Sequence, residues 1–252
     1  MPEPFFVPDL VESLFGPSIP EVFGYEQARA ALEFLSPELL EPSTVATIRA
    51  EFQSDPALAH VCLSGALQSP VADELRQALE EADFRPHPHA EYALHVAPRD
   101  AQSPSRLTRF VDWLATPLAA SFHLRWLGVE QSALPDGRTH RIQVQTSRML
   151  EGERFPLHMD THAPGIVVVY NFSEADWRSS KGGQLYFPRE DGSDYLAVPP
   201  LFNSVFMSYA NGAVHGVREV RGSWVRYSIT AFYLGDEPSD GERVAKDGLD
   251  PP

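Results

Sequence analysis

Three residues have the types and spacing of a metal site. His158 and Asp160 form an H-x-D motif, and His215 follows Asp160 by 55 residues. Residues i and i+2 of a β-strand point to the same side, so His158 and Asp160 can reach one metal ion while Met159 faces away. Two imidazoles and one carboxylate form the facial triad that holds non-haem Fe(II) and leaves coordination positions open. Because H-x-D often arises by chance, the motif needs support from its surroundings.

The residues around these ligands predict short β-strands. Apolar or alternating runs are separated by Gly, Pro and Asp signals, and they show no helical period. The expected strands are 166–170, 184–187, 195–198, a run over 203–209, and 224–234. Such a series favours a β-sandwich or jelly roll for this half of the chain, in which a neighbouring strand supplies the third ligand.

Arg226 is a second residue suited to chemistry. It lies 11 residues after His215, and Ser228 follows two positions later, on the same face of a strand. A buried guanidinium needs an anion, and it offers a planar fork that matches a carboxylate. Beside a facial triad, this R-x-S pair indicates a site for a dicarboxylate co-substrate. Taken alone, it also fits an exposed strand arginine paired with an acid such as Glu219.

The stretch from about residue 142 to 234 resembles the catalytic core of the prolyl-hydroxylase type of 2-oxoglutarate- and Fe(II)-dependent oxygenases. The matching segments are RMLEGERFPLHMD, VVVYNFSEADW, KGGQLYFP and HGVREVRGSWVRYSIT, in the order and approximate spacing of that family. The run over 199–206 is similar to the branch that includes ribosomal-protein prolyl hydroxylases. The resemblance implies a mainly β fold with a helical flank: a double-stranded β-helix, a cupin-like jelly roll, braced by N-terminal helices.

The resemblance also implies the cofactors and the roles of the site residues. His158, Asp160 and His215 would bind Fe(II), and Arg226 with Ser228 would hold the distal carboxylate of 2-oxoglutarate. O2 would be the second co-substrate, and ascorbate is a further cofactor that such enzymes can take.

Two positions bear on details of that site. Many relatives carry a tyrosine that contacts the co-substrate at the position comparable to Met149. Tyr170 is the nearest substitute, and Asn171 is the alternative, since residues of the strand after H-x-D often contact the co-substrate. Related halogenases have a small residue in place of the carboxylate, so Asp160 favours hydroxylation or a related oxidation.

The expected function is hydroxylation of an unactivated C–H bond, in a prolyl residue of a protein or peptide or in a proline-like compound. One alternative is a hydroxylase of another free amino acid or of a natural product. An alternative of a different class is a non-catalytic, cupin-like metal-binding sensor or scaffold. Asp160 and Arg226 speak against it, because a binding module needs no anchor for 2-oxoglutarate.

Composition limits the binding partners and the cellular compartment that we expect. The formal charge of −15 and the pI near 4.9 leave no basic stripe for nucleic acid, and they favour a neutral or basic substrate. The single cysteine, Cys62, excludes an internal disulfide and suits a reducing compartment, where Fe(II) is easier to keep. The sequence shows no signal peptide and no transmembrane span, so we expect a cytoplasmic protein without membrane contact.

One catalytic domain is expected, in four segments. These are an N-terminal extension over 1–40, Pro-rich at its start, a helical support region over 41–135, a catalytic core over 136–236 and a mobile tail over 237–252. Within the support region, apolar residues at helical spacing predict three helices that brace one sheet. They are a helix capped by Ser43 and helices over 70–82 and 107–115.

Four further histidines were weighed as site residues. His87, His89 and His95 invite a second metal site, but the first two alternate with prolines in a predicted loop or edge strand. We therefore expect no second metal there. His162 follows His158 by four residues, and it is expected to line the active-site entrance rather than to bind the metal.

Overall fold

The computed structural model describes residues 25–55, 57–86, 95–96, 105–129, 141–160, 163–189, 191–210 and 212–235. The expected tail, the start of the N-terminal extension and the histidines at 87, 89 and 162 lie outside these residues. Within the described ranges, no helix is both long enough and apolar enough to cross a membrane.

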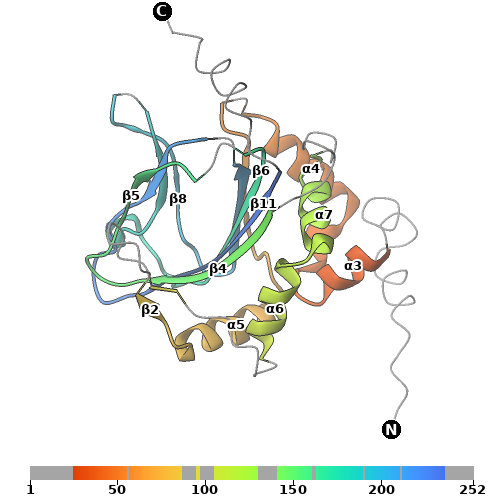
Figure 1. Ribbon diagram of the computed structural model, residues 1–252, viewed down its shortest axis with the longest axis horizontal. Helices are drawn as coiled ribbons and strands as arrows, with labels where there is room; N and C mark the ends of the chain where they lie inside the picture. The colour runs from red at the N-terminus through yellow and green to blue at the C-terminus, as the bar shows by residue number, and fades with distance from the viewer. Residues whose placement is uncertain are drawn as a thin grey trace, which may run out of the picture.

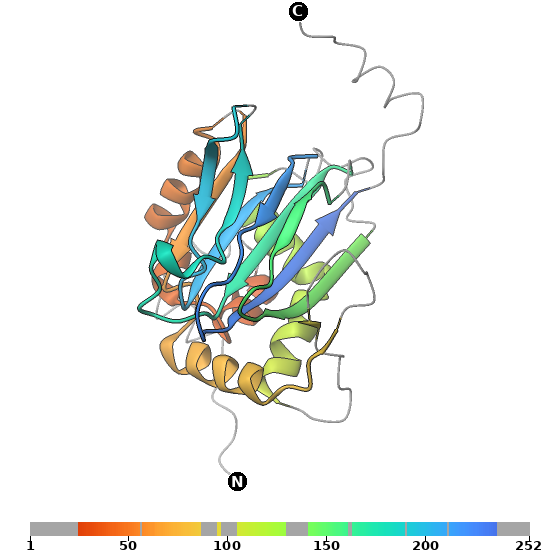
Figure 2. The ribbon, with the colours of Figure 1, turned by 90° about the vertical axis from the view of Figure 1, so that its left-hand side faces the viewer.

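Two antiparallel sheets face each other at the centre of the molecule (Figure 1, Figure 2). The larger sheet has seven strands in the order β1-β9-β6-β11-β4-β3-β2, and the smaller has four in the order β5-β10-β7-β8. The strands of the larger sheet are β1 (His60–Ser64), β2 (Arg85–Pro86), β3 (His95–Val96), β4 (Arg141–Met149), β6 (Gly165–Asn171), β9 (Ser204–Tyr209) and β11 (Arg226–Leu234). Those of the smaller sheet are β5 (Phe155–His158), β7 (Leu185–Pro188), β8 (Asp194–Val198) and β10 (His215–Val217). The predicted fold class, mainly β with a helical flank, is confirmed.

Helices cover the face of the larger sheet that lies away from the smaller sheet (Figure 1). They are α3 (Tyr25–Leu32), the short 3-10 helix η1 (Pro37–Leu40), α4 (Pro42–Phe52), α5 (Ser69–Glu81), α6 (Arg106–Leu114) and α7 (Pro117–Trp126). The α4, α5 and α6 helices match the predicted ones within about a residue. Ser43 does not cap α4, however, because the helix begins one residue earlier, at Pro42, with Glu41 as its N-cap.

The sequence analysis did not predict helices α3, η1 and α7 or strand β1. Thr116 caps α7 by accepting a hydrogen bond from the Ala119 amide, and Pro117 occupies the first turn, where a missing N–H costs nothing. Strand β1 lies inside the segment predicted as helical support, yet it pairs with β9 as an edge of the larger sheet. That segment therefore contributes to the sheet as well as to the helical layer.

Strand β6 shows why the central strands read as continuous apolar runs. All of its residues are buried, since helices cover one face and the smaller sheet covers the other. Ile166, Val168 and Tyr170 belong to the core shared with the helices. Val167 and Val169 belong to the core between the sheets. Side-chain alternation thus decides which residues can reach the space between the sheets.

The strand connections divide the larger sheet into two ends. Short links join β5 to β6 and β9 to β10, so His158 and His215 lie near the end where Gly165 pairs with Leu234. We call this the metal end. Arg226 begins β11 at the opposite end, which we call the arginine end. A molecule that touches both ends must extend along β11.

Candidate active site

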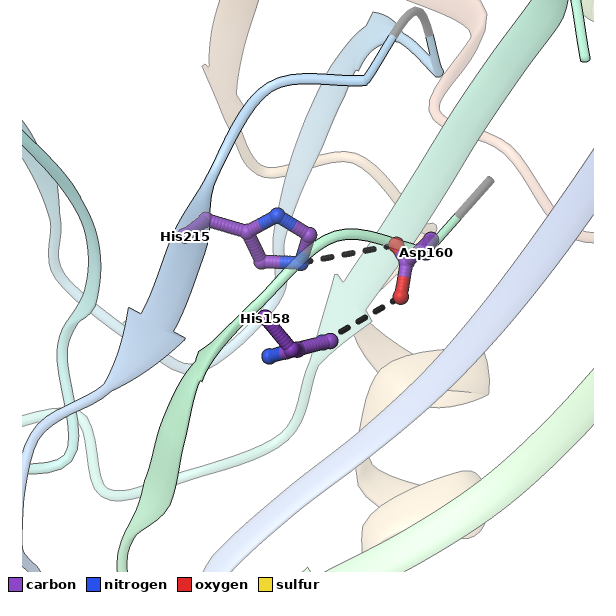
Figure 3. A group of neighbouring side chains, drawn as sticks. All are labelled: His158, Asp160 and His215. Atoms are coloured by element: carbon purple, nitrogen blue, oxygen red, sulfur yellow. Dashed lines mark ion pairs between the residues drawn. The ribbon is translucent and has the colours of Figure 1, made fainter. Parts of the chain in front are cut away.

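The three predicted metal ligands come together in the structure (Figure 3). His158 of β5 and His215 of β10 are direct cross-strand partners, and Asp160 follows two residues after His158. The Asp160 carboxylate oxygens lie 3.2 Å from His158 Nε2 and 3.4 Å from His215 Nε2. One ligand atom from each residue lies within 4.8 Å of the other two. Two neighbouring strands therefore hold two imidazoles and a carboxylate around one point.

Hydrogen bonds within the chain orient both imidazoles. His158 Nδ1 lies 2.9 Å from the Pro156 carbonyl oxygen, and His215 Nδ1 lies 2.9 Å from that of Ala213. A carbonyl accepts only, so each Nδ1 must carry the proton and each Nε2 keeps its lone pair for a metal. Burial lowers the pKa of His215, and the Asp160 charge opposes this shift. The donor set fits a divalent metal such as Fe(II), with the remaining coordination positions open.

A cavity of about 150 Å³ lies between the two sheets and includes all three ligands in its lining. Much of the cavity wall is apolar, and both sheets contribute to it. The apolar lining includes Val167, Val169, Leu185, Phe187, Phe206, Val217 and Phe232. The polar residues Gln145, Ser147, Ser208, Ser228, Thr230 and Arg226 interrupt this wall. The cavity is thus an apolar chamber that joins the metal end to the arginine end.

Arg226 is buried in this wall and has no acidic partner among the described residues. Its exposed fraction is 5%, and burial lowers its pKa to about 10, so the guanidinium stays charged at neutral pH. Arg226 Nε donates to the Gly183 carbonyl at 3.0 Å, and Nη1 donates to Ser228 Oγ at 3.0 Å. Glu219, the alternative partner weighed from the sequence, lies instead 3.7 Å from Arg221 Nε. A buried, uncompensated cation fits a site for an anionic ligand.

Hydroxyl groups lie beside this guanidinium. Ser228 is 2% exposed, and its Oγ is 2.9 Å from Ser147 Oγ on the neighbouring strand β4. Sequence reasoning missed Ser147. The available signal was the alternation of β4, which places Gln145, Ser147 and Met149 on one face, and all three line the cavity.

The structure separates Tyr170 from the cavity, which corrects its expected role as a co-substrate contact. Its side chain lies in the core shared with the helices, and its hydroxyl is 2.9 Å from His123 Nε2. His123 Nδ1 lies 2.7 Å from the Ala119 carbonyl oxygen and must carry the proton, so Tyr170 donates to Nε2. The strand alternation places Tyr170 on the helix face of the sheet, whereas Asn171 lies on the face toward the smaller sheet. Asn171 is 3% exposed, and its Oδ1 has no partner among the described groups.

His95 is the one of the four further histidines that the structure describes, and its neighbour there is an acidic side chain. His95 Nε2 lies 2.9 Å from Glu153 Oε1, and the side chain of Glu153 also accepts from the Leu150 amide. The triad is the metal-binding cluster found in the described part of the chain. His95 therefore ties β3 to the loop that leads into β5.

Comparisons with known proteins agree with this geometry. Residues 144–234 match the family model of the 2OG-Fe(II) oxygenase superfamily. No curated protein sequence matches the chain significantly.

Among solved structures, a prolyl-4-hydroxylase from Pseudomonas putida is 14% identical, with a TM-score of 0.57, over 75% of this chain and 100% of that one. A prolyl hydroxylase from Trichoplax adhaerens, in complex with a hypoxia inducible factor peptide fragment, is 16% identical, with a TM-score of 0.53, over 80% and 90%. The epimerase SnoN from nogalamycin biosynthesis is 14% identical, with a TM-score of 0.51, over 79% and 88%.

At these identities the solved structures establish the fold alone, and they do not single out the ribosomal-protein branch suggested by the sequence. The family match covers β11 and both strands that carry the triad, which are the elements that form the cavity. The match identifies residues 144–234 as a 2OG-Fe(II) oxygenase core, of the dioxygenase class that uses Fe(II), 2-oxoglutarate and O2.

Proposed function

We propose that this protein hydroxylates an unactivated C–H bond of a prolyl residue in a polypeptide, or of a proline-like compound. His158, Asp160 and His215 hold Fe(II), and Arg226 with Ser228 holds the distal carboxylate of 2-oxoglutarate. The observation that carries the proposal is the buried Arg226, without an acidic partner among the described residues, in the cavity that also contains the triad. A structural metal site alone gives no reason to bury such a charge.

Iron(II) bound with 2-oxoglutarate and O2 supplies an oxidant strong enough to hydroxylate an unactivated C–H bond, with succinate and CO2 as co-products. The chain's own residues perform three other tasks. The Pro156 and Ala213 carbonyls fix the His158 and His215 rings so that their Nε2 atoms face one point. Arg226 binds and orients the co-substrate through its free N–H groups. The apolar wall excludes water from the reacting groups.

The prolyl preference rests on two observations. Prolyl hydroxylases from two organisms share the fold over at least three quarters of this chain, and one of them was solved with a peptide. The wall of the cavity beyond the triad and Arg226 is neutral in the described residues, which suits an uncharged prolyl ring.

With one cysteine and a need for reduced iron, we propose that the reaction takes place in the cytoplasm.

A natural-product substrate is the second candidate. SnoN, whose structure was solved with iron, 2-oxoglutarate and a nogalamycin compound, shares the fold to nearly the same degree as the prolyl hydroxylases. The cavity wall of apolar and aromatic residues would also accept a small hydrophobic molecule.

Product analysis separates these candidates. Purified protein would be incubated with Fe(II), 2-oxoglutarate, O2 and ascorbate, together with proline-containing peptides, free L-proline or an aromatic polyketide. The proposal predicts succinate formation that depends on the prolyl compound, together with one added oxygen atom on its ring by mass spectrometry. Stimulation by the polyketide alone would favour the second candidate. Succinate release unaffected by every prolyl compound, with none of them modified, would contradict the prolyl assignment.

A further inference from the structure

The orientation of the Arg226 guanidinium depends on two hydrogen bonds. A guanidinium carries five N–H donors, and Gly183 and Ser228 each accept one of them. Three donors are therefore left for a ligand. The bond from Nε to the Gly183 carbonyl restricts rotation of the guanidinium plane. The position of the Gly183 carbonyl thus controls how Arg226 presents its free donors.

The turn that carries this carbonyl is tightly confined. Gly182 and Gly183 both have positive φ, +70° and +75°. A Cβ on Gly182 would lie 1.8 Å from the Glu219 carbonyl oxygen, and a Cβ on Gly183 would lie 2.8 Å from the Trp224 ring. These contacts require glycine at both positions. The turn is pressed against the segment that leads into β11.

Trp224 is the residue against which Gly183 packs. It is 5% exposed and forms a small separate core with Met149 and Val220. Its indole Nε1 lies 3.0 Å from the Lys181 carbonyl oxygen and 3.1 Å from that of Arg221. One side chain thus bridges the glycine turn and the chain just before Arg226, two residues upstream of it. Trp224 itself is not part of the cavity lining.

We propose that Trp224 is a positioning residue for Arg226. By holding the Gly182–Gly183 turn against β11, Trp224 keeps the Gly183 carbonyl on Arg226 Nε and leaves the other guanidinium donors for the co-substrate carboxylate. This inference rests on the proposed role of Arg226 in binding 2-oxoglutarate. It assigns a function in co-substrate affinity to a side chain that touches neither the metal nor the cavity.

The test is the Trp224→Phe variant, which keeps an aromatic ring but lacks both the indole N–H and the outer ring that touches Gly183. We expect the KM for 2-oxoglutarate to rise about five- to tenfold, the loss of roughly one buried hydrogen bond, while kcat at saturating co-substrate stays close to that of the wild type. A co-substrate without the distal carboxylate, 2-oxobutyrate, should be used equally well by both proteins. This last readout would not follow from general destabilisation.

Trp126→Phe is the matched control. Trp126 is fully buried in α7, and its Nε1 donates to the Leu39 carbonyl at 3.1 Å, on the helical side of the molecule. The control should leave the 2-oxoglutarate KM unchanged. Gly183→Ala is a second variant that moves the same carbonyl by a different route, and it should raise the KM as well. Circular dichroism verifies that each variant is folded.

The outcomes separate this inference from the proposed function. Wild-type KM in both folded Trp224→Phe and Gly183→Ala proteins would overturn the inference and leave the role of Arg226 intact. An equal KM increase in Trp126→Phe, or an equal loss with 2-oxobutyrate, would overturn it as well. A wild-type protein that does not bind 2-oxoglutarate would overturn the proposed function, and the inference with it.

Discussion

The two ends of the cavity differ in solvent exposure. At the metal end, the side chains of His158, His215 and Asp160 keep exposed fractions of 17%, 16% and 25%. At the arginine end, Arg226 and Ser228 are 5% and 2% exposed. A metal that must exchange water for substrate and O2 needs an accessible position, whereas an anchor for one carboxylate gains strength from exclusion of water. Under the proposed function, the metal end would support turnover and the arginine end would set the affinity for the co-substrate.

The largest effect is expected at the metal end. Asp160→Ala removes the carboxylate that lies between two imidazoles, so metal binding and substrate-dependent succinate formation should fall below detection. The thermal unfolding temperature should change little, because Asp160 is partly exposed. Asp176→Ala, at a carboxylate that is 75% exposed, is the control. Retained activity in the Asp160 variant would remove this residue from the ligand set.

At the arginine end, Arg226→Ala should weaken 2-oxoglutarate binding by about 2 to 5 kcal/mol, because it leaves the co-substrate carboxylate buried without a partner. Fe(II) affinity, measured without co-substrate, should stay unchanged. Arg221→Ala removes a guanidinium whose side chain is 68% exposed and should have no effect. An Arg226 variant with wild-type co-substrate affinity would contradict the proposal that the arginine end sets this affinity.

The opposite face of the sheet should affect stability rather than binding. Burial of His123 lowers its pKa from 6.5 to about 4. The unfolded chain then takes up a proton at higher pH than the folded protein does. The His123 contribution to stability is complete above about pH 6.5 and is lost as the pH falls toward 4, by up to about 1.4 kcal/mol per pH unit.

Urea unfolding at several pH values would measure this slope, and His123→Gln should remove it without altering 2-oxoglutarate affinity. His60→Gln, at a half-buried histidine of β1, provides the comparison. A pH slope that persists in the His123 variant would assign it to other groups. A weakened co-substrate affinity would mean that the two faces of the sheet are coupled.

The smallest effect is expected from a neighbour of the anchor. Ser147→Ala removes a hydroxyl 2.9 Å from Ser228 Oγ, which should weaken 2-oxoglutarate binding by about 0.5 to 1.5 kcal/mol. Ser208→Ala removes another buried cavity hydroxyl, at the metal end, and should leave co-substrate affinity unchanged. Equal losses in both variants would show that affinity does not depend on the arginine end alone.

Much of this site could be read from the sequence because its signals are local. The spacing of His158 and Asp160 places them on one side of a strand, and the apolar run of β6 predicts a buried strand. The partnership with His215 needed the cross-strand register that only the fold provides. The family resemblance supplied that partner in advance, whereas spacing alone did not.

The errors arose where two faces of one strand look alike. Every residue of β6 is buried, so the sequence offered no alternation to show that Tyr170 faces the helices. Ser147 was not recognised because its place in the site depends on its pairing with Ser228 on the neighbouring strand. Helix α7 was missed although Thr116 and Pro117 form a recognisable start, because its faces are nearly all apolar or small.

The most direct test of the central claim is an anaerobic titration of the metal-free protein with Fe(II), followed by 2-oxoglutarate. The account predicts a weak visible charge-transfer absorption that appears only when both are present, because the keto acid must chelate iron held by the triad while Arg226 binds its other end. Absence of this absorption from folded protein would contradict the account, since the triad and Arg226 would then not form one co-substrate site.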